Sequence, residues 1–199
     1  MSVCEALPHP IIFKSVYLVA FYSFLRISNL VPHSIAAFSP LEQLARGDVF
    51  FAPPGLQLLI TWSKTLQNRN KVIVIKLPAI KNVAICPVYH IKQLLQLLPG
   101  DQDSPLFQIP CYGKWVPLTD SRVRKHFKDV LIKLKLHNKG ITFHTFRKSG
   151  ASLAFQGNAS LQSIKAHGTW SSETVWRYII QNQDGSAEVA HTLASLASS

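Results

Sequence analysis

Acidic residues, cysteines and long apolar runs are all scarce in this chain, and each shortage narrows what the protein can be. The 199 residues include only 10 Asp and Glu against 21 Lys and Arg, which gives a formal net charge of +11 at pH 7. This imbalance favours a polyanionic partner, most often nucleic acid. The alternative is a generic basic surface, as in a protein that lies against ribosomes or membranes.

The three cysteines, Cys4, Cys86 and Cys111, are odd in number and form neither a CxxC pair nor an array with histidines. A disulfide-stabilised framework and a Cys/His zinc site both need more cysteines at closer, regular spacing. We therefore expect reduced thiols in a protein that holds neither kind of site.

The longest apolar run covers only residues 16–25 and is flanked by Lys14 and Arg26. A helix needs about 20 apolar residues to span a bilayer, so this run predicts no membrane segment. No basic start followed by an apolar stretch and a cleavage site is present, so we expect no secretion and a nuclear or cytoplasmic location. Hydrophobic residues make up 47% of the chain, which is enough for one packed core.

Apolar spacing and capping residues predict that most of the chain is helical. The expected helices cover 11–30, 87–98, 121–136, 142–157 and 161–166, followed by one that carries Tyr178. The helix over 121–136 is strongly basic, and Thr119 or Asp120 is expected to cap it.

The remaining segments predict one small antiparallel sheet. Two strands are expected over 56–64 and 70–78, joined by a turn at 67–70. The segments 33–54 and 100–117 are expected to be irregular, because they combine prolines and turn residues with short apolar pieces. No internal repeat or linker interrupts the chain, so the prediction is a single α+β domain that is mainly α.

The segment 141–180 contains residues suited to chemistry on a phosphodiester. His144 and Arg147 are three apart and share one helix face. Trp170 and then Tyr178 follow on later elements, and they add an indole N–H donor and a phenolic oxygen. An HxxR pair arises easily by chance, and a lone Tyr or Trp is usually a packing residue, so the order of these residues carries more weight than any one of them.

Two cations further towards the N-terminus complete this set. Arg26 directly follows the apolar run, where an uncompensated charge is costly to bury, so it is expected to be paired or directed into a site. The alternative for Arg26 is a side chain that extends to solvent. Lys64 lies in TWSKTLQ at the end of an expected strand, where the alternative is an ordinary hairpin lysine.

In order, FLRISNL, SKT, HTFRKSG and GTWSSETVWRYI resemble the catalytic domain of tyrosine recombinases, the phage integrase family. The resemblance runs over about residues 13–181 and is most specific in its last forty. A tryptophan in GxWSS with a tyrosine eight residues later is most similar to eukaryotic mobile-element recombinases of the Crypton and DIRS type. The resemblance implies a tail over 1–10, a catalytic domain over 11–183 and a tail or docking helix over 184–199.

The resemblance also implies a mechanism. Tyr178 would attack a phosphodiester to form a 3′-phosphotyrosine, and Arg26 and Arg147 would hold the non-bridging oxygens. Lys64 would protonate the leaving 5′-oxygen and His144 would assist proton transfer. Because the covalent intermediate conserves the bond energy, neither a nucleotide cofactor nor a metal is needed. Double-stranded DNA is the implied partner, with a homo-oligomer, a tetramer, assembled on it and no small-molecule substrate.

Trp170 would donate its N–H to the phosphate and pack against the helix that carries the tyrosine. His167 is the alternative for that position, since related bacterial enzymes more often have a histidine there. Two departures are evident: Asn29 stands where the family usually has an acidic residue, and Lys148 stands where a histidine is common. Asn29 can form hydrogen bonds but supplies no charge to orient Arg26.

Family members also have an N-terminal helical domain that closes on the far side of the DNA, and the residues before Pro10 are too few to form one. This predicts a fragment, a truncated gene product or a domesticated remnant. The alternatives to an active enzyme are therefore a recombinase-derived DNA-binding protein that no longer cuts and, more remotely, a basic helical protein whose motif is coincidental.

Overall fold

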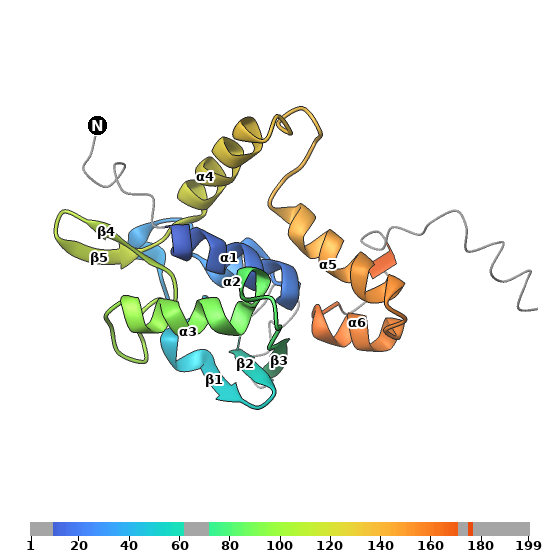
Figure 1. Ribbon diagram of the computed structural model, residues 1–199. Helices are drawn as coiled ribbons and strands as arrows, with labels where there is room; N and C mark the ends of the chain where they lie inside the picture. Colours follow the sequence, from blue (N-terminus) through green and yellow to red (C-terminus); the bar gives the residue numbers. More distant parts are fainter. Residues whose placement is uncertain (1–9, 62–71, 171–174, 177–199) are drawn as a thin grey trace, which may run out of the picture.

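The computed structural model describes residues 10–61, 72–170 and 175–176 (Figure 1). In chain order its α-helices are α1 (Pro10–Ser23), α2 (Ile27–Leu30), α3 (Pro87–Leu97), α4 (Asp120–Lys133), α5 (His144–Gln156) and α6 (Leu161–His167). Its strands are β1 (Val49–Ala52), β2 (Gly55–Ile60), β3 (Ile73–Pro78), β4 (Gln108–Cys111) and β5 (Lys114–Pro117). The prediction of a mainly helical protein with a small antiparallel sheet is confirmed, although the strands form two sheets.

Helix α1 lies at the centre of the molecule, with α3 and the three-stranded sheet on one side and α5 at its C-terminal end (Figure 1). Ile12, Val16, Val19 and Ala20 are completely buried. A helix that is apolar on most of its faces must be covered on most sides, and here a sheet and two helices cover it. The apolar run over residues 16–25, which is too short to span a membrane, therefore lies in the core of this fold.

The predicted helix over 11–30 is wrong in its length, because the chain breaks at Phe24. Ser23 Oγ accepts a hydrogen bond from the Leu25 N–H at 3.2 Å and donates to the Val19 carbonyl at 2.6 Å. Phe24 then has φ +54°, a left-handed conformation that a bulky residue rarely adopts. The chain resumes as α2, so Arg26 lies in the corner between two helices and not on the side of one.

The three-stranded sheet follows the alternation that its sequence predicts. Leu56 and Leu58 of β2 lie opposite Leu77 and Ile75 of β3, and all four side chains are buried. The predicted strands are confirmed as far as the described residues extend, and the expected turn at 67–70 lies outside them. Strand β1 was not predicted, because its four residues lie in the segment expected to be irregular.

A hairpin of β4 and β5 corrects the expectation of an irregular segment over 100–117. Cys111 pairs with Lys114, which leaves Tyr112 and Gly113 as a two-residue loop with φ of +48° and +76°. Positive φ at both positions matches the twist of a tight hairpin. Cys111 is disulfide-bonded, which corrects the expectation of reduced thiols, whereas Cys86 is a buried free thiol.

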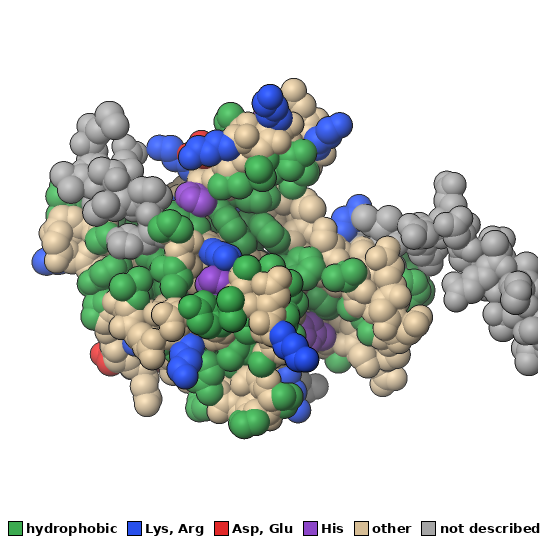
Figure 2. All heavy atoms as spheres, in the orientation of Figure 1, with side chains coloured by type: hydrophobic (Ala, Val, Ile, Leu, Met, Phe, Trp, Pro, Cys, Tyr) green, Lys and Arg blue, Asp and Glu red, His purple; other side chains and the backbone are tan. Residues whose placement is uncertain are grey.

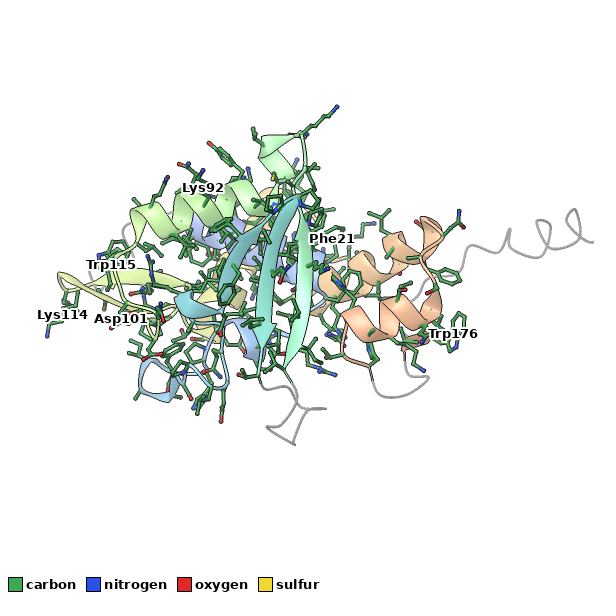
Figure 3. All side chains as sticks on the ribbon, turned by 90° about the horizontal axis from the view of Figure 1, so that it is seen from below. Phe21, Lys92, Asp101, Lys114, Trp115 and Trp176 are labelled. Atoms are coloured by element: carbon green, nitrogen blue, oxygen red, sulfur yellow. The ribbon has the colours of Figure 1, made fainter. Side chains whose placement is uncertain are left out.

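The four helices predicted towards the C-terminus, up to α6, are confirmed to within a few residues. Helix α4 projects away from the body (Figure 1), and Lys and Arg side chains gather on it in Figure 2. Helices α5 and α6 form a separate unit, at whose far end Trp176 lies in Figure 3. This unit has a second, smaller apolar cluster, which we call the α5–α6 cluster: Phe24, Ala151, Ile164, Trp170 and Val175.

The unit of α5 and α6 meets α1 at Gly150. A Cβ on Gly150 would overlap the Phe21 carbonyl oxygen and lie 2.6 Å from the Phe24 ring, so only glycine allows the two helices to approach this closely.

None of the helices in the described part of the chain is both long enough and apolar enough to cross a membrane.

Candidate active site

Three of the six predicted site residues line one cavity. Arg26, His144 and Arg147 come from two regions more than a hundred residues apart, and they surround a space of about 310 Å³. Asp120 and Arg124, at the start of α4, line the same cavity. The cavity therefore lies where the break after α1, the start of α4 and the start of α5 meet.

Arg26 reaches this cavity because of the chain reversal at Phe24. It precedes the first turn of α2 in an extended conformation, with φ −76° and ψ 152°. Its Nη1 atom is buried and has no hydrogen-bond partner among the described residues. Leaving a guanidinium nitrogen buried and unbonded costs free energy, and an anion in the cavity would remove that cost.

Arg147 is held more tightly. Its side chain is only 1% exposed, and its guanidinium donates hydrogen bonds to the carbonyl oxygens of Phe24 and, at 2.7 Å, Gly168. The central carbon of the guanidinium lies 3.8 Å from the centre of the Trp170 ring. Two carbonyl acceptors and an aromatic face therefore fix the plane of this cation.

Backbone strain gathers around Arg147. Phe24, whose carbonyl accepts one hydrogen bond, has φ +54°, and Thr169, which follows the other acceptor, has φ +58°. Left-handed conformations are costly for aromatic and β-branched residues and persist only where the surrounding packing imposes them. Gly168 is equally constrained, because a Cβ there would overlap the Trp170 ring. The fold thus accepts strain on both sides of one guanidinium.

His144 begins α5 and is exposed at the edge of the cavity. Partial burial lowers the pKa of its imidazole, and the positive charges of Arg147 and Arg26 lower it further. Its ring is therefore more often neutral near pH 7 than an ordinary histidine, which suits a group that accepts a proton.

Trp170 is buried against Arg147, with its ring face on the guanidinium. The predicted alternative, His167, points elsewhere: its Nε2 lies 2.8 Å from the Tyr22 carbonyl, and its ring meets Phe24 edge-on. His167 lines a different cavity, of about 350 Å³, whose walls are mainly apolar. Of the two candidates, only Trp170 contacts the guanidinium of Arg147.

Lys64 and Tyr178 lie outside the described residues, and so does the whole predicted tyrosine helix, apart from Val175 and Trp176. Their roles therefore stay predictions. Asn29, which replaces the usual acidic residue, is buried with 3% of its surface exposed. It supplies no carboxylate beside Arg26.

Sequence reasoning missed Asp120 and Arg124 as members of the site. Their spacing of four residues indicates an ion pair on one helix face, but not that this face borders Arg26. With them, the described residues that line the cavity include three guanidinium groups, one imidazole and one carboxylate. Such an excess of cationic donors suits a phosphate or another oxyanion. Among the described residues, no group of three His, Cys, Asp or Glu side chains could hold a metal ion.

Comparison with known proteins identifies the fold. No family model matches the sequence, and no curated protein matches it. Two solved structures illustrate the likeness. The XerH site-specific recombinase bound to a palindromic difH substrate, a post-cleavage complex, has a TM-score of 0.65 at 17% identity and covers 94% of this chain. The Tn1549 transposon integrase in complex with circular intermediate DNA has a TM-score of 0.57 at 16% identity and covers 89%.

The chain spans about half the length of these proteins, 48% of XerH and 56% of the Tn1549 integrase fragment. Its mainly helical fold with a small antiparallel sheet matches the catalytic domain of tyrosine recombinases, as the sequence resemblance predicted. At this level of identity the likeness establishes the fold and leaves the chemistry to the residues of the cavity.

Proposed function

We propose that this chain is the catalytic part of a DNA breaking-and-rejoining enzyme that acts through a 3′-phosphotyrosine intermediate. The observation that carries the proposal is the convergence of Arg26, His144 and Arg147 on one cavity, within a fold shared with DNA-bound recombinases. A cavity with this charge fits a phosphodiester, and a net charge of +11 fits the DNA around it.

In the proposed reaction, the phenolic oxygen of Tyr178 attacks the phosphorus and the 5′-oxygen leaves. Arg26 and Arg147 stabilise the charge that develops on the non-bridging oxygens. His144, with its lowered pKa, accepts the phenolic proton, and Lys64 donates a proton to the leaving oxygen. The reverse sequence rejoins the strand, so no bond energy is lost to hydrolysis.

The proposed role of Trp170 is to fix Arg147, because the central carbon of the guanidinium lies over its ring, 3.8 Å from the ring centre. A mispositioned arginine would lose the alignment of both donors at once. The packing of Trp170 against the tyrosine helix remains part of the proposal.

Double-stranded DNA is the proposed partner, contacted in part by the basic helix α4, and a tetramer is the proposed assembly on it. Within the recombinases, the spacing of Trp170 and Tyr178 supports a mobile-element enzyme of the Crypton or DIRS type. A nuclear or cytoplasmic location is proposed with it.

The test is to incubate the protein with labelled, nicked duplex DNA and to run the products on a denaturing gel. We expect a labelled band shifted by the mass of the protein, and we expect Tyr178→Phe to abolish it while DNA binding is retained. A band that persists in Tyr178→Phe would mean that another residue is the nucleophile. Absence of the band under all conditions would contradict the proposed reaction.

The second candidate is a recombinase-derived DNA-binding protein that no longer cuts. Asn29 favours it, because the charge that would orient Arg26 is missing and one guanidinium nitrogen of Arg26 is left without a partner among the described residues. This candidate predicts salt-sensitive DNA binding with no covalent product. The Asn29→Asp variant sharpens the choice, because restoring the charge should increase adduct formation only if the remaining machinery is active.

A further inference from the structure

We propose that Arg124 is a third phosphate-binding guanidinium of the cavity, and that Asp120 holds it at the rim until a phosphate takes the place of the carboxylate. The inference rests on the proposed function, because it adds a residue to the same site. It concerns the part of the site that α4 contributes.

The position of this ion pair is the first observation. Asp120 and Arg124 both line the cavity that contains Arg26, His144 and Arg147. Arg124 contacts Asp120 with two nitrogens, Nε towards Oδ1 and Nη2 towards Oδ2 at 3.2 Å. Asp120 thus occupies one edge of the guanidinium, the Nε and Nη2 edge, in the two-bond geometry that a phosphate could also adopt.

The two partners differ in how firmly they are held. The backbone N–H of Asp120 donates to the Pro32 carbonyl at 2.9 Å, which ties the start of α4 to the end of the Arg26 segment. The Arg124 side chain is 53% exposed, and its only ion pair among the described residues is the one with Asp120. The carboxylate is therefore a fixed point, and the guanidinium is the member that is free to reorient.

The charges favour such an exchange. An ion pair as exposed as this one is weak, so a phosphate that also contacts Arg26 and Arg147 can compete for Arg124. In the absence of phosphate, Asp120 offsets one of three like charges around the cavity. The pair thereby lowers the repulsion between the guanidinium groups of the empty site.

A purely structural role makes a different prediction. An aspartate in the first turn of a helix, paired with an arginine four residues later, stabilises many helices. In that case, removing Arg124 would leave phosphate binding unchanged except for the loss of one general positive charge. Lys128 provides the matched control, because it is exposed one turn further along α4 and does not line the cavity.

The experiment titrates inorganic phosphate, at constant ionic strength, into the wild type and into Arg124→Ala, Lys128→Ala and Asp120→Asn. Binding is followed by the NMR shift of the His144 imidazole, and circular dichroism checks that each variant is folded. We expect Arg124→Ala to bind phosphate about tenfold more weakly, and Lys128→Ala to remain within about twofold of the wild type. Asp120→Asn should bind more tightly, because a competing carboxylate is gone.

Equal losses in Arg124→Ala and Lys128→Ala would overturn the inference, as would weaker phosphate binding by Asp120→Asn. The same variants in the nicked-DNA assay separate this inference from the proposed function. Phosphate binding that depends on Arg124, without any covalent adduct, would support the inference and contradict the proposed reaction. An adduct formed equally well by Arg124→Ala and Lys128→Ala would support the proposed reaction and contradict the role of Arg124.

Discussion

The body built on α1, α3 and the three-stranded sheet is stabilised differently from the unit of α5 and α6. The body buries large aliphatic side chains such as Leu58, Ile75 and Ile91, each completely. The α5–α6 cluster is smaller, includes the aromatic rings of Phe24 and Trp170, and packs beside a buried arginine, Arg147, which is held by backbone carbonyls and a tryptophan. Apolar burial thus supports the scaffold, and polar and aromatic contacts support the site.

This difference has a physical reason. An aliphatic core gains free energy from excluding every ligand and water molecule, whereas a phosphate site needs cationic side chains that line a cavity. The strained residues Phe24 and Thr169 lie at the second region, where their conformations serve the hydrogen bonds of Arg147. The free-energy cost of the strained backbone beside Arg147 must be offset by the apolar burial in the body, because both regions belong to one fold.

The largest expected effect tests the stability of the two regions directly. Leu58→Ala should lower the free energy of unfolding by about 4 kcal/mol, because it empties a fully packed position. Ile164→Ala should cost only about 2 kcal/mol, because Ile164 already borders the apolar cavity of about 350 Å³ and loses fewer contacts. Urea unfolding followed by circular dichroism measures the free energy of unfolding of both variants. Equal losses in the two variants would mean that the two regions do not differ in how tightly they are packed.

Arg147→Ala should lower the free energy of unfolding by about 3 kcal/mol, since the carbonyls of Phe24 and Gly168 would lose a charged donor. Adduct formation should fall by about two to three orders of magnitude, as for other fixed donors to a developing charge. Lys148→Ala, one residue further along α5, is the control and should change neither quantity substantially. An Arg147→Ala protein of normal stability would show that the guanidinium does not hold the two segments together.

The contact between the two regions is tested at Gly150. Gly150→Ala should cost about 2 kcal/mol, because the added methyl group overlaps the Phe21 carbonyl and forces α5 away from α1. Gly157→Ala is the matched control at the end of the same helix, where the nearest atoms lie 3.4 Å or more from an added Cβ. Thermal unfolding compares the two, and a similar loss in both would mean that helix propensity, not close approach, determines the effect.

The smallest expected effect concerns the charges of the cavity. In Arg26→Gln the pKa of His144 should rise, because one of the positive charges that lower it is removed. The pKa of His167 should not change, since burial lowers it and its hydrogen-bond partner is the Tyr22 carbonyl. NMR titration of both imidazoles in one sample measures the two pKa values. A His144 pKa that is the same in Arg26→Gln and in the wild type would mean that the charge of Arg26 does not act on this imidazole.

The same lowered pKa links His144 to stability. A histidine whose folded pKa lies below its unfolded value of about 6.5 binds fewer protons when folded, so stability is retained above that pH and is lost as the pH falls through the folded pKa. His144→Gln should therefore reduce the loss of stability on acidification. Urea midpoints at pH 7.5 and 5.5 measure this difference, and an unchanged pH dependence would contradict it.

The amino-acid sequence by itself determined the fold class, the helices α3 to α6 and the two longer strands. These features depend on local periodicity and caps, as at Pro87 in the first turn of α3 or Ser160 before α6, where neighbours in sequence suffice. The order of Arg26, His144, Arg147 and Trp170 also predicted a shared site, and the roles of Lys64 and Tyr178 stay predictions.

Only the tertiary structure decided the break at Phe24 and the place of Asp120 and Arg124 beside the cavity. Phe24 takes a left-handed conformation although its sequence continues a helical pattern, because its carbonyl bonds to Arg147, 123 residues later. Long-range packing and hydrogen bonds can outweigh a local cost of a few kcal/mol, and no window of sequence contains both partners. The chain reversal at Phe24 directs Arg26 into the cavity.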